Sequence, residues 1–219
     1  MIQDPMLPNL TEEARRLNDE FAIHIVDDEP NILRSIRRLL GRAGYQTHLH
    51  HSASEFLHEY DGSPACLILD LKMPGMGGEL LVSHILQENM NLVVLVVTAH
   101  ASIRSAVFLT KAGVVDVIEK PFDNARLLEA VHKMTQNARR IFAKRALTDD
   151  FTARMSSLSR REYDVFNLLL SNLSSAEIAK QLGLSKKTVD IHRSRVMDKM
   201  GTASVAELIV NWTTLVKTD

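Results

Sequence analysis

The sequence predicts an α/β fold, a doubly wound parallel sheet of five strands in the order 2-1-3-4-5, followed by an all-α domain of four helices. Short apolar runs alternate with amphipathic helical patterns five times in about 115 residues, which is typical of βα units. The later part of the chain has three helix-start signals and no strand pattern. Residues 1–137 hold 12 Lys and Arg against 18 Asp and Glu, whereas residues 138–219 hold 14 against 9. This change of sign indicates two domains, the second suited to a polyanionic partner.

Five apolar runs are expected to form the strands of the sheet. The third and fourth runs are continuously apolar, as strands buried on both faces of a parallel sheet are. The runs cover residues 21–26, 45–50, 67–69, 92–97 and 114–119. Helical spacing of apolar residues predicts a helix after each strand. These helices are expected after Pro30, at residues 54–60, 79–87 and 103–111, and from Asp123 onward.

Polar residues follow four of the five strands. Asp27 and Asp28 follow the first, Asp70 the third, Thr98 the fourth and Lys120 the fifth. In the order 2-1-3-4-5, these carboxyl ends line one crevice beside the topological switch point of the sheet. Three crowded carboxylates repel one another unless a cation joins them, and oxygen ligands without His or Cys favour Mg²⁺.

Asp70 is the candidate nucleophile of this crevice. In-line phosphoryl transfer needs a positioned nucleophile, a metal on the phosphoryl oxygens and a further cation or hydrogen-bond donor. Asp70, Mg²⁺, Lys120 and Thr98 would supply these parts. Taken alone, Asp70 would be interpreted as a turn aspartate at the end of a strand, and the four other polar residues favour the phosphoryl-transfer interpretation.

Residues 21–137 resemble the receiver domain of two-component response regulators. The resemblance rests on four motifs in order, each at the end of a strand: Val26-Asp27-Asp28-Glu29, Leu69-Asp70-Leu71-Lys72-Met73-Pro74-Gly75, Val97-Thr98-Ala99 and Glu119-Lys120-Pro121-Phe122. It implies that Asp70 accepts a phosphoryl group from a sensor histidine kinase. It also implies that Asp27, Asp28 and Asp70 hold Mg²⁺ together with the backbone carbonyl of Lys72.

The resemblance assigns further roles to residues around the crevice. Lys120 would pair with the phosphoryl group, the Thr98 hydroxyl would move to bond it, and the Lys120–Pro121 peptide would be cis. Lys72 and His100 occupy positions that tune dephosphorylation in the family. One residue departs from the pattern, because Val117 stands where the family usually has an aromatic side chain that reports phosphorylation. A strict coupling between Thr98 and an aromatic rotamer is therefore not expected.

The basic half has the pattern of a helix-turn-helix domain. Capping boxes at Ser159-Arg-Arg-Glu162, Ser174-Ser-Ala-Glu177 and Ser204-Val-Ala-Glu207 open three helices, and Gly183-Leu184-Ser185 turns into a fourth at residues 186–200. On a helical wheel, Val189, Val196 and Met200 share the core face of this fourth helix, and Lys187, Ile191, Ser194 and Asp198 lie opposite. A groove-facing surface with an apolar group, a hydroxyl and a carboxylate could read bases.

Residues 158–216 resemble the LuxR-type DNA-binding domain. The resemblance rests on Leu158-Ser-Arg-Arg-Glu162, Ile178-Ala179, the run Leu184–Arg193 and Lys199-Met200. The wheel and the resemblance together give the expected contacts to bases and phosphates: Lys186, Lys187, Thr188, Asp190, Ile191, Ser194, Arg195 and Lys199. With the receiver, the chain resembles the FixJ subfamily of response regulators.

These observations define an expected domain organisation and location. Residues 1–20 form an N-terminal arm, 21–137 the receiver, 138–157 a helix that fades into a flexible linker, and 158–219 the DNA-binding domain. No apolar run is long enough to cross a bilayer, the first twenty residues lack a signal-peptide core, and Cys66 is the only cysteine. A cytoplasmic location without a membrane partner is expected.

The expected function is transcriptional control switched by phosphorylation of Asp70. Phosphorylation would promote homodimerisation and binding to promoter DNA, with RNA polymerase a possible further partner. A pseudo-receiver that never takes phosphate stays open because of Val117. A haloacid-dehalogenase phosphatase would need an aspartate two residues after the nucleophile, where Lys72 stands. A small-molecule-sensing LuxR relative would lack the strand-end carboxylates, and the helical domain taken alone could instead bind protein.

Overall fold

The computed structural model describes residues 20–99 and 103–216 of the 219-residue chain. The chain divides after Phe142 into two compact units, which we call the receiver unit and the C-terminal unit. His100 lies outside the described residues. Within the described part, no helix combines the length and the apolar character that spanning a membrane requires.

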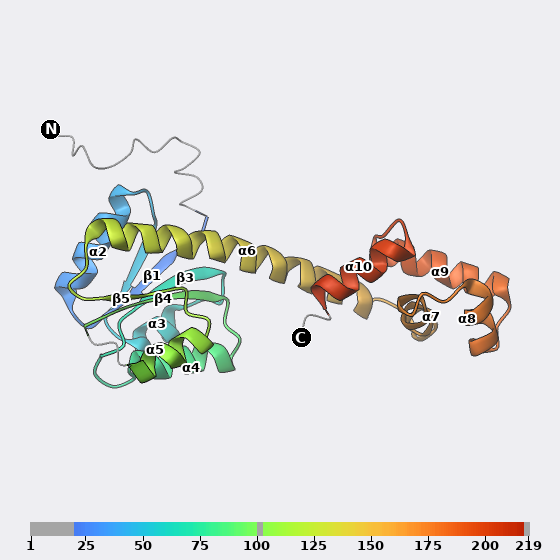
Figure 1. The fold of residues 1–219 in the computed structure, drawn as a ribbon, viewed down its shortest axis with the longest axis horizontal. Helices are drawn as coiled ribbons and strands as arrows, with labels where there is room; N and C mark the ends of the chain where they lie inside the picture. Colours follow the sequence, from blue (N-terminus) through green and yellow to red (C-terminus); the bar gives the residue numbers. More distant parts are fainter. Residues whose placement is uncertain (1–19, 100–102, 217–219) are drawn as a thin grey trace. The chain divides into compact units, whose positions relative to one another are not determined.

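The receiver unit is built on a five-stranded sheet in which every neighbouring pair of strands is parallel (Figure 1). The strand order β2-β1-β3-β4-β5 confirms the predicted 2-1-3-4-5 topology. The strands are β1 (Ile23–Val26), β2 (Thr47–His50), β3 (Ala65–Leu69), β4 (Leu92–Thr98) and β5 (Val117–Glu119). The helices are α2 (Pro30–Arg42), α3 (Ala53–Glu59), α4 (Gly78–Gln87), α5 (Ile103–Lys111) and α6 (Asn124–Ser156).

Helices cover both faces of this sheet, as parallel strands require. Helices α2 and α6 lie on one face and α3, α4 and α5 on the other (Figure 1). All residues of β3 and β4 are buried, and the side chains of each strand alternate between two apolar cores. These central strands hold the loops at their carboxyl ends in fixed positions relative to one another.

Local signals account for the starts of the helices. Pro30 begins α2, where its missing N–H costs nothing, and the Ser52 hydroxyl accepts the Glu55 N–H at the start of α3. Ahead of α6, the Asp123 carboxylate accepts the N–H of Ala125. The sequence predicts that the fifth strand begins at residue 114, but it begins at Val117. The Val115 N–H and the Asp116 carbonyl already form hydrogen bonds with Val94 and Val96 of β4 ahead of the strand.

The C-terminal unit contains four helices that follow α6: α7 (Arg160–Leu170), α8 (Ser175–Leu182), α9 (Lys186–Met200) and α10 (Val205–Leu215). Complete capping boxes open α7 and α8, as predicted. At the start of α10, the Ser204 hydroxyl accepts the Glu207 N–H. The Glu207 carboxylate accepts the Ala203 N–H and not that of Ser204, so the predicted capping box is only half formed. Gly183 adopts the left-handed conformation that ends α8 and turns the chain into α9.

Helix α6 differs from the sequence prediction in its length. Residues 138–156 continue the helix, where the sequence predicted that it fades into a flexible linker. The physical reason is that both ends of this segment are packed. Ala138 and Phe142 are buried in the receiver core, and Phe151 is buried in the C-terminal core with Met155 packed against it.

Candidate functional site

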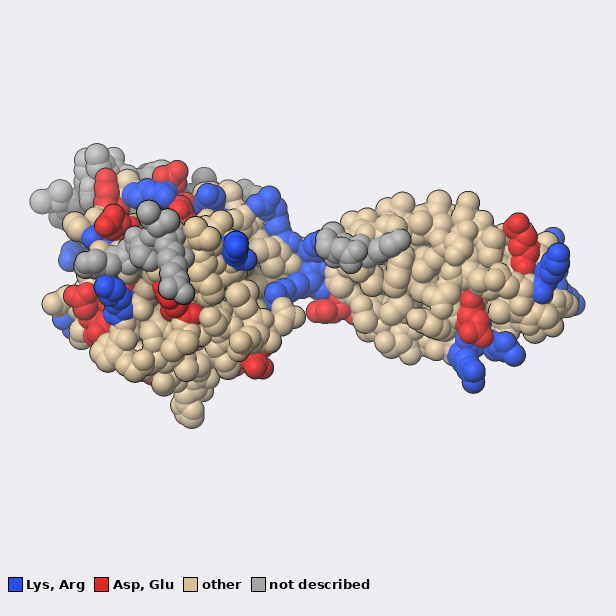
Figure 2. Space-filling model, turned by 60° about the horizontal axis from the view of Figure 1, so that its bottom comes forward, with Lys and Arg blue, Asp and Glu red and all other residues tan. Residues whose placement is uncertain are grey.

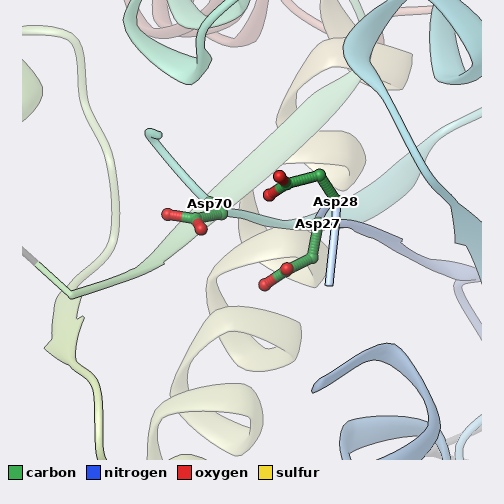
Figure 3. Close-up of side chains that lie close together, drawn as sticks. All are labelled: Asp27, Asp28 and Asp70. Carbon is green, nitrogen blue, oxygen red and sulfur yellow. The ribbon is translucent and has the colours of Figure 1, made fainter. Parts of the chain in front are cut away.

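Three aspartates meet at the carboxyl ends of β1 and β3. The side chains of Asp27, Asp28 and Asp70 lie close together (Figure 3), and one carboxylate oxygen of each lies within 4.8 Å of those of the other two. Asp27 and Asp70 are buried, whereas Asp28 is exposed at the mouth of the site. Across the described part of the chain, this is the one cluster of three or more such side chains close enough to share a metal ion.

Lys120 supplies the positive charge of the site from the end of β5. Its Nζ lies 2.7 Å from Asp27 Oδ2 and 2.9 Å from Asp70 Oδ2, and 3.5 Å from Glu29 Oε1. Burial by itself would lower the pKa of the Lys120 ammonium, but its hydrogen bonds to the two buried carboxylates outweigh this and raise the pKa. Lys120 is therefore charged at neutral pH and holds the two aspartates together.

Backbone hydrogen bonds between neighbouring strands fix the acidic loops. The Asp70 N–H donates to the Val26 carbonyl at 2.9 Å, which continues the β1–β3 ladder to the site. The Lys72 N–H donates to Asp70 Oδ1 at 3.2 Å, and the Glu29 N–H donates to Asp27 Oδ1 at 2.9 Å. Each buried carboxylate thus has one oxygen on a loop amide and the other on the Lys120 ammonium.

The other side of the site is formed by β4 and β5. Thr98 is fully buried at the end of β4, and its carbonyl accepts the Lys120 N–H at 2.9 Å. The Lys120–Pro121 peptide is cis, as the resemblance implied. On the other flank, Gly78 lies so close to the loop after β3 that a Cβ there would approach the Asp70 carbonyl oxygen to 2.3 Å. Only glycine fits at this position.

The donor set fits a small, hard divalent cation. All three side chains offer carboxylate oxygens, which Mg²⁺ prefers, and the exposed Asp28 leaves a side open to water and to a phosphoryl group. Burial raises the pKa of the Asp27 carboxyl, so its charged form is held at a cost that a nearby cation would offset. As predicted, these residues lie together at one edge of the sheet, whereas the approach of Glu29 to Lys120 and the close fit of Gly78 were not anticipated from the sequence.

Helix α9 presents the face predicted for nucleic-acid contact. Val189, Val196 and Met200 are buried, as the wheel predicted. Seven of the eight expected contact residues are exposed, among them Ile191, which is 46% accessible; they are Lys186, Lys187, Asp190, Ile191, Ser194, Arg195 and Lys199. In Figure 2, most of the visible face of the C-terminal unit is uncharged, and Lys and Arg side chains lie at its margins next to Asp and Glu side chains.

Two of the expected contacts, Lys199 and Thr188, make hydrogen bonds within the C-terminal unit. Lys199 Nζ donates to Glu162 Oε2 at 2.7 Å and to the Ser157 carbonyl at 2.9 Å, which ties the end of α9 to the start of α7. The Thr188 hydroxyl lies 2.8 Å from that of Ser185, the residue that caps α9. A helical wheel cannot reveal such partners, because Glu162 and Lys199 are 37 positions apart.

Comparison with known proteins identifies both units. Residues 23–132 match the family described as "Response regulator receiver domain", and residues 156–211 match "Bacterial regulatory proteins, luxR family". The chain is 34% identical over 191 residues to the transcriptional regulatory protein FixJ of Rhizobium meliloti (strain 1021), covering 87% of this chain and 94% of that protein. This chain belongs to the FixJ family of response regulators. Its fold and its two domain types make it a two-component transcriptional response regulator.

Other FixJ-type relatives extend over most of the chain. The C4-dicarboxylate transport transcriptional regulatory protein DctR of Rhodobacter capsulatus is 36% identical, over 86% of this chain and 97% of that protein. Among solved structures, the response regulator StyR has a TM-score of 0.76 at 31% identity and covers 88% of this chain and 98% of its own. Full-length FixJ from B. japonicum has a TM-score of 0.55 at 31% identity, with 92% and 100% covered.

Proposed function

We propose that Asp70 is the phosphoacceptor of this FixJ-type regulator and that its phosphorylation controls DNA binding by the C-terminal unit. The observation that carries the proposal is the pair of contacts of Lys120 Nζ, at 2.7 Å from Asp27 and 2.9 Å from Asp70. It joins three strand ends into one charged site. The phosphoryl donor would be a sensor histidine kinase, the partner that a receiver domain implies.

In the transfer step, a carboxylate oxygen of Asp70 attacks the phosphorus of the donor. The bond from phosphorus to the leaving group breaks, and the leaving group departs with the electron pair. The carboxylates of Asp27, Asp28 and Asp70 and the backbone carbonyl of Lys72 would hold Mg²⁺, which would neutralise charge on the phosphoryl oxygens. Lys120, already 2.9 Å from Asp70, would exchange a carboxylate contact for a phosphoryl oxygen.

Thr98 would report the new charge to the rest of the receiver unit. It is buried at the end of β4, one strand away from Asp70, and a small movement of its hydroxyl would let it bond a phosphoryl oxygen. Val117, which stands in place of an aromatic side chain, is half-buried and packs against the core on the α4 and α5 side. The change would therefore reach α5 through packing and not through the rotation of a ring.

DNA binding would use the exposed face of α9 in the major groove. Ile191 offers an apolar contact for a thymine methyl, Ser194 a hydroxyl and Asp190 an acceptor for cytosine N4. Lys186, Lys187 and Arg195 would contact phosphates. Thr188 remains a proposed DNA contact through its side-chain hydroxyl. We leave Lys199 out of the DNA-facing set because it is held by Glu162 and by the Ser157 carbonyl.

Homodimerisation on phosphorylation is part of this proposal, because one helix-turn-helix module reads only a few base pairs and paired modules read longer sites. We also propose that the chain contacts RNA polymerase. Its location would be the cytoplasm, where promoter DNA is accessible. We expect no multi-turnover phosphatase activity, since two positions after Asp70 stands Lys72 and not the aspartate that a haloacid-dehalogenase phosphatase needs as general acid.

Intact mass spectrometry after incubation with acetyl phosphate and Mg²⁺ tests the proposal. We expect one phosphoryl adduct on the wild-type chain, none on Asp70→Asn, and an unchanged adduct on the matched control Asp61→Asn, an exposed carboxylate outside the site. Omission of Mg²⁺ should strongly reduce the wild-type adduct. A wild-type chain that stays unmodified would favour the pseudo-receiver, and sustained phosphate release from generic substrates would favour a phosphatase.

A further inference from the structure

The last turn of α9 is held from outside by the end of α6. Arg154, in the last turns of α6, donates from Nη1 to the carbonyl of Met200 at 3.3 Å. The last carbonyls of a helix have no partner within the helix and carry partial negative charge. A guanidinium at this position supplies both a hydrogen-bond donor and a positive charge. Arg154 therefore caps the carboxyl end of the helix proposed to read DNA.

Gly201 makes room for this contact. It follows Met200 with a φ of +64°, the left-handed conformation that ends helices and favours glycine. A Cβ at Gly201 would lie 2.0 Å from Arg154 Nη1. The guanidinium thus occupies the space that any side chain at this position would need, and the fit between α6 and α9 is close.

A second contact orients the guanidinium from its own helix. Arg154 Nε lies 2.8 Å from Asp150 Oδ2, one turn earlier in α6. Nearby, the Thr148 hydroxyl donates to the Leu215 carbonyl at the end of α10, so α6 contacts the ends of two helices of the C-terminal unit. In Figure 1, this part of α6 lies alongside α10. Phe151 is buried in the same core as the residues of α7 to α10.

We propose that Arg154 is a positioning residue for DNA binding, which holds the end of α9 in place without touching DNA. The inference rests on the proposed use of α9 in DNA binding. It goes beyond the family match, which begins at residue 156, because it makes the end of α6 a working part of the DNA-binding unit. The Arg154 side chain contacts the Met200 carbonyl and packs against Gly201. By holding the end of α9, it sets the orientation in which Ile191 and Ser194 face the DNA.

The test compares Arg154→Ala, Arg154→Lys and Asp150→Asn in the full chain with Lys144→Ala as a matched control. Lys144→Ala removes a positive charge from an exposed position of the same helix, within the same unit. Amide hydrogen exchange reports on the last turn of α9, where the N–H groups of Gly201 and Thr202 donate to the carbonyls of Asp198 and Met197. DNA affinity is measured on a duplex that the phosphorylated wild-type chain selects from a random pool.

For Arg154→Ala, we expect exchange at Gly201 and Thr202 to rise at least fivefold and DNA affinity to fall three- to tenfold. The slope of log affinity against log salt should stay at the wild-type value, since no phosphate contact is lost. Arg154→Lys should recover part of the loss, Asp150→Asn should show a smaller change in the same direction, and Lys144→Ala should show none. The milder Asp150→Asn variant keeps the test decisive if Arg154→Ala folds poorly.

Unchanged exchange and affinity in Arg154→Ala would overturn the inference. So would a salt slope reduced by about 0.9 at unchanged exchange, because this is the signature of a direct phosphate contact. If the wild-type chain selects no DNA, the proposed function fails, and the exchange measurements still decide whether Arg154 holds the end of α9.

Discussion

Replacing Glu162 by alanine should destabilise the C-terminal unit more than any other loss of a helix cap in this chain. Glu162 closes the capping box of α7 by accepting the Ser159 N–H at 2.8 Å, and it also accepts a hydrogen bond from Lys199 Nζ at 2.7 Å. Its side chain is 5% exposed and that of Lys199 39% exposed. The carboxylate therefore joins the start of α7 to the end of α9 in a largely water-excluded place.

The magnitude follows from these two contacts. A charge-assisted hydrogen bond contributes about 1.5–3 kcal/mol, and a capping interaction about 1 kcal/mol. We expect Glu162→Ala to lower the free energy of unfolding of the C-terminal unit by about 3 kcal/mol. Glu177 is the matched control, because it closes the capping box of α8 with the same geometry, at 2.8 Å from the Ser174 N–H, but is exposed. Glu177→Ala should cost less than half as much.

Urea denaturation followed by tryptophan fluorescence measures both variants. The chain has one tryptophan, Trp212, whose ring packs against Phe151 and Phe166 in the C-terminal core, so its emission reports on this unit alone. Equal losses for Glu162→Ala and Glu177→Ala would refute the reasoning, since the contact with Lys199 would then contribute nothing.

The pair of Glu162 and Lys199 makes the stability of the C-terminal unit depend on pH. The hydrogen bond from Lys199, together with that from the Ser159 backbone, lowers the pKa of Glu162 from 4.5 to about 2. A carboxyl whose pKa is lower in the folded state stabilises the fold above its unfolded pKa and loses that contribution as the pH falls. The difference in stability between wild type and Glu162→Gln should thus be constant above about pH 5 and shrink between pH 4.5 and pH 2. A difference that does not change over this range would contradict the assignment.

Three further predictions concern the acidic site and the DNA face. Lys120→Met should lower the free energy of unfolding of the receiver unit by about 3 kcal/mol in Mg²⁺-free buffer, because it leaves two buried carboxylates without their cation. In chemical denaturation, added Mg²⁺ should restore part of this loss. The control Lys72→Met, at an exposed position, should not differ from wild type. Gly78→Ala should slow modification by acetyl phosphate and lower the stability of the receiver unit, because its Cβ would push the loop after β3. The control Gly41→Ala, with open space around it, should stabilise α2 by about 0.5–1 kcal/mol. Lys187→Ala should reduce the salt slope of DNA affinity by about 0.9, and an unchanged slope would remove it from the phosphate contacts.

The receiver fold and its acidic site were predictable because their signals are local. Continuous apolar runs identify β3 and β4. The polar residue directly after each parallel strand must lie at the carboxyl edge of the sheet, which all the strands share. Asp70 and Lys120 could therefore be placed together from sequence although they are 50 positions apart. The residues that share the core face of α9 were predicted correctly for the same reason, since helical periodicity alone determines them.

The contacts that sequence analysis did not reveal are those that no periodicity encodes. Lys199 has the type and position of a phosphate contact, which stays a prediction, and its bond to Glu162 became visible only in the fold. The segment after Ala138 is rich in charge and was expected to lose its helical structure, but Phe142 and Phe151 anchor it in two different cores. The contact of Arg154 with Met200 gave no signal in the sequence, because its partner is a backbone carbonyl 46 positions away.

If a phosphoryl group on Asp70 changes DNA binding, the affinity of the chain for one DNA duplex must change when Asp70 is phosphorylated. Dissociation constants are measured for the wild-type chain and Asp70→Asn, each before and after treatment with acetyl phosphate and Mg²⁺. We expect a tighter complex for the treated wild type and no change for Asp70→Asn. Equal affinities for the treated and untreated wild type, with the adduct present by mass, would contradict this expectation.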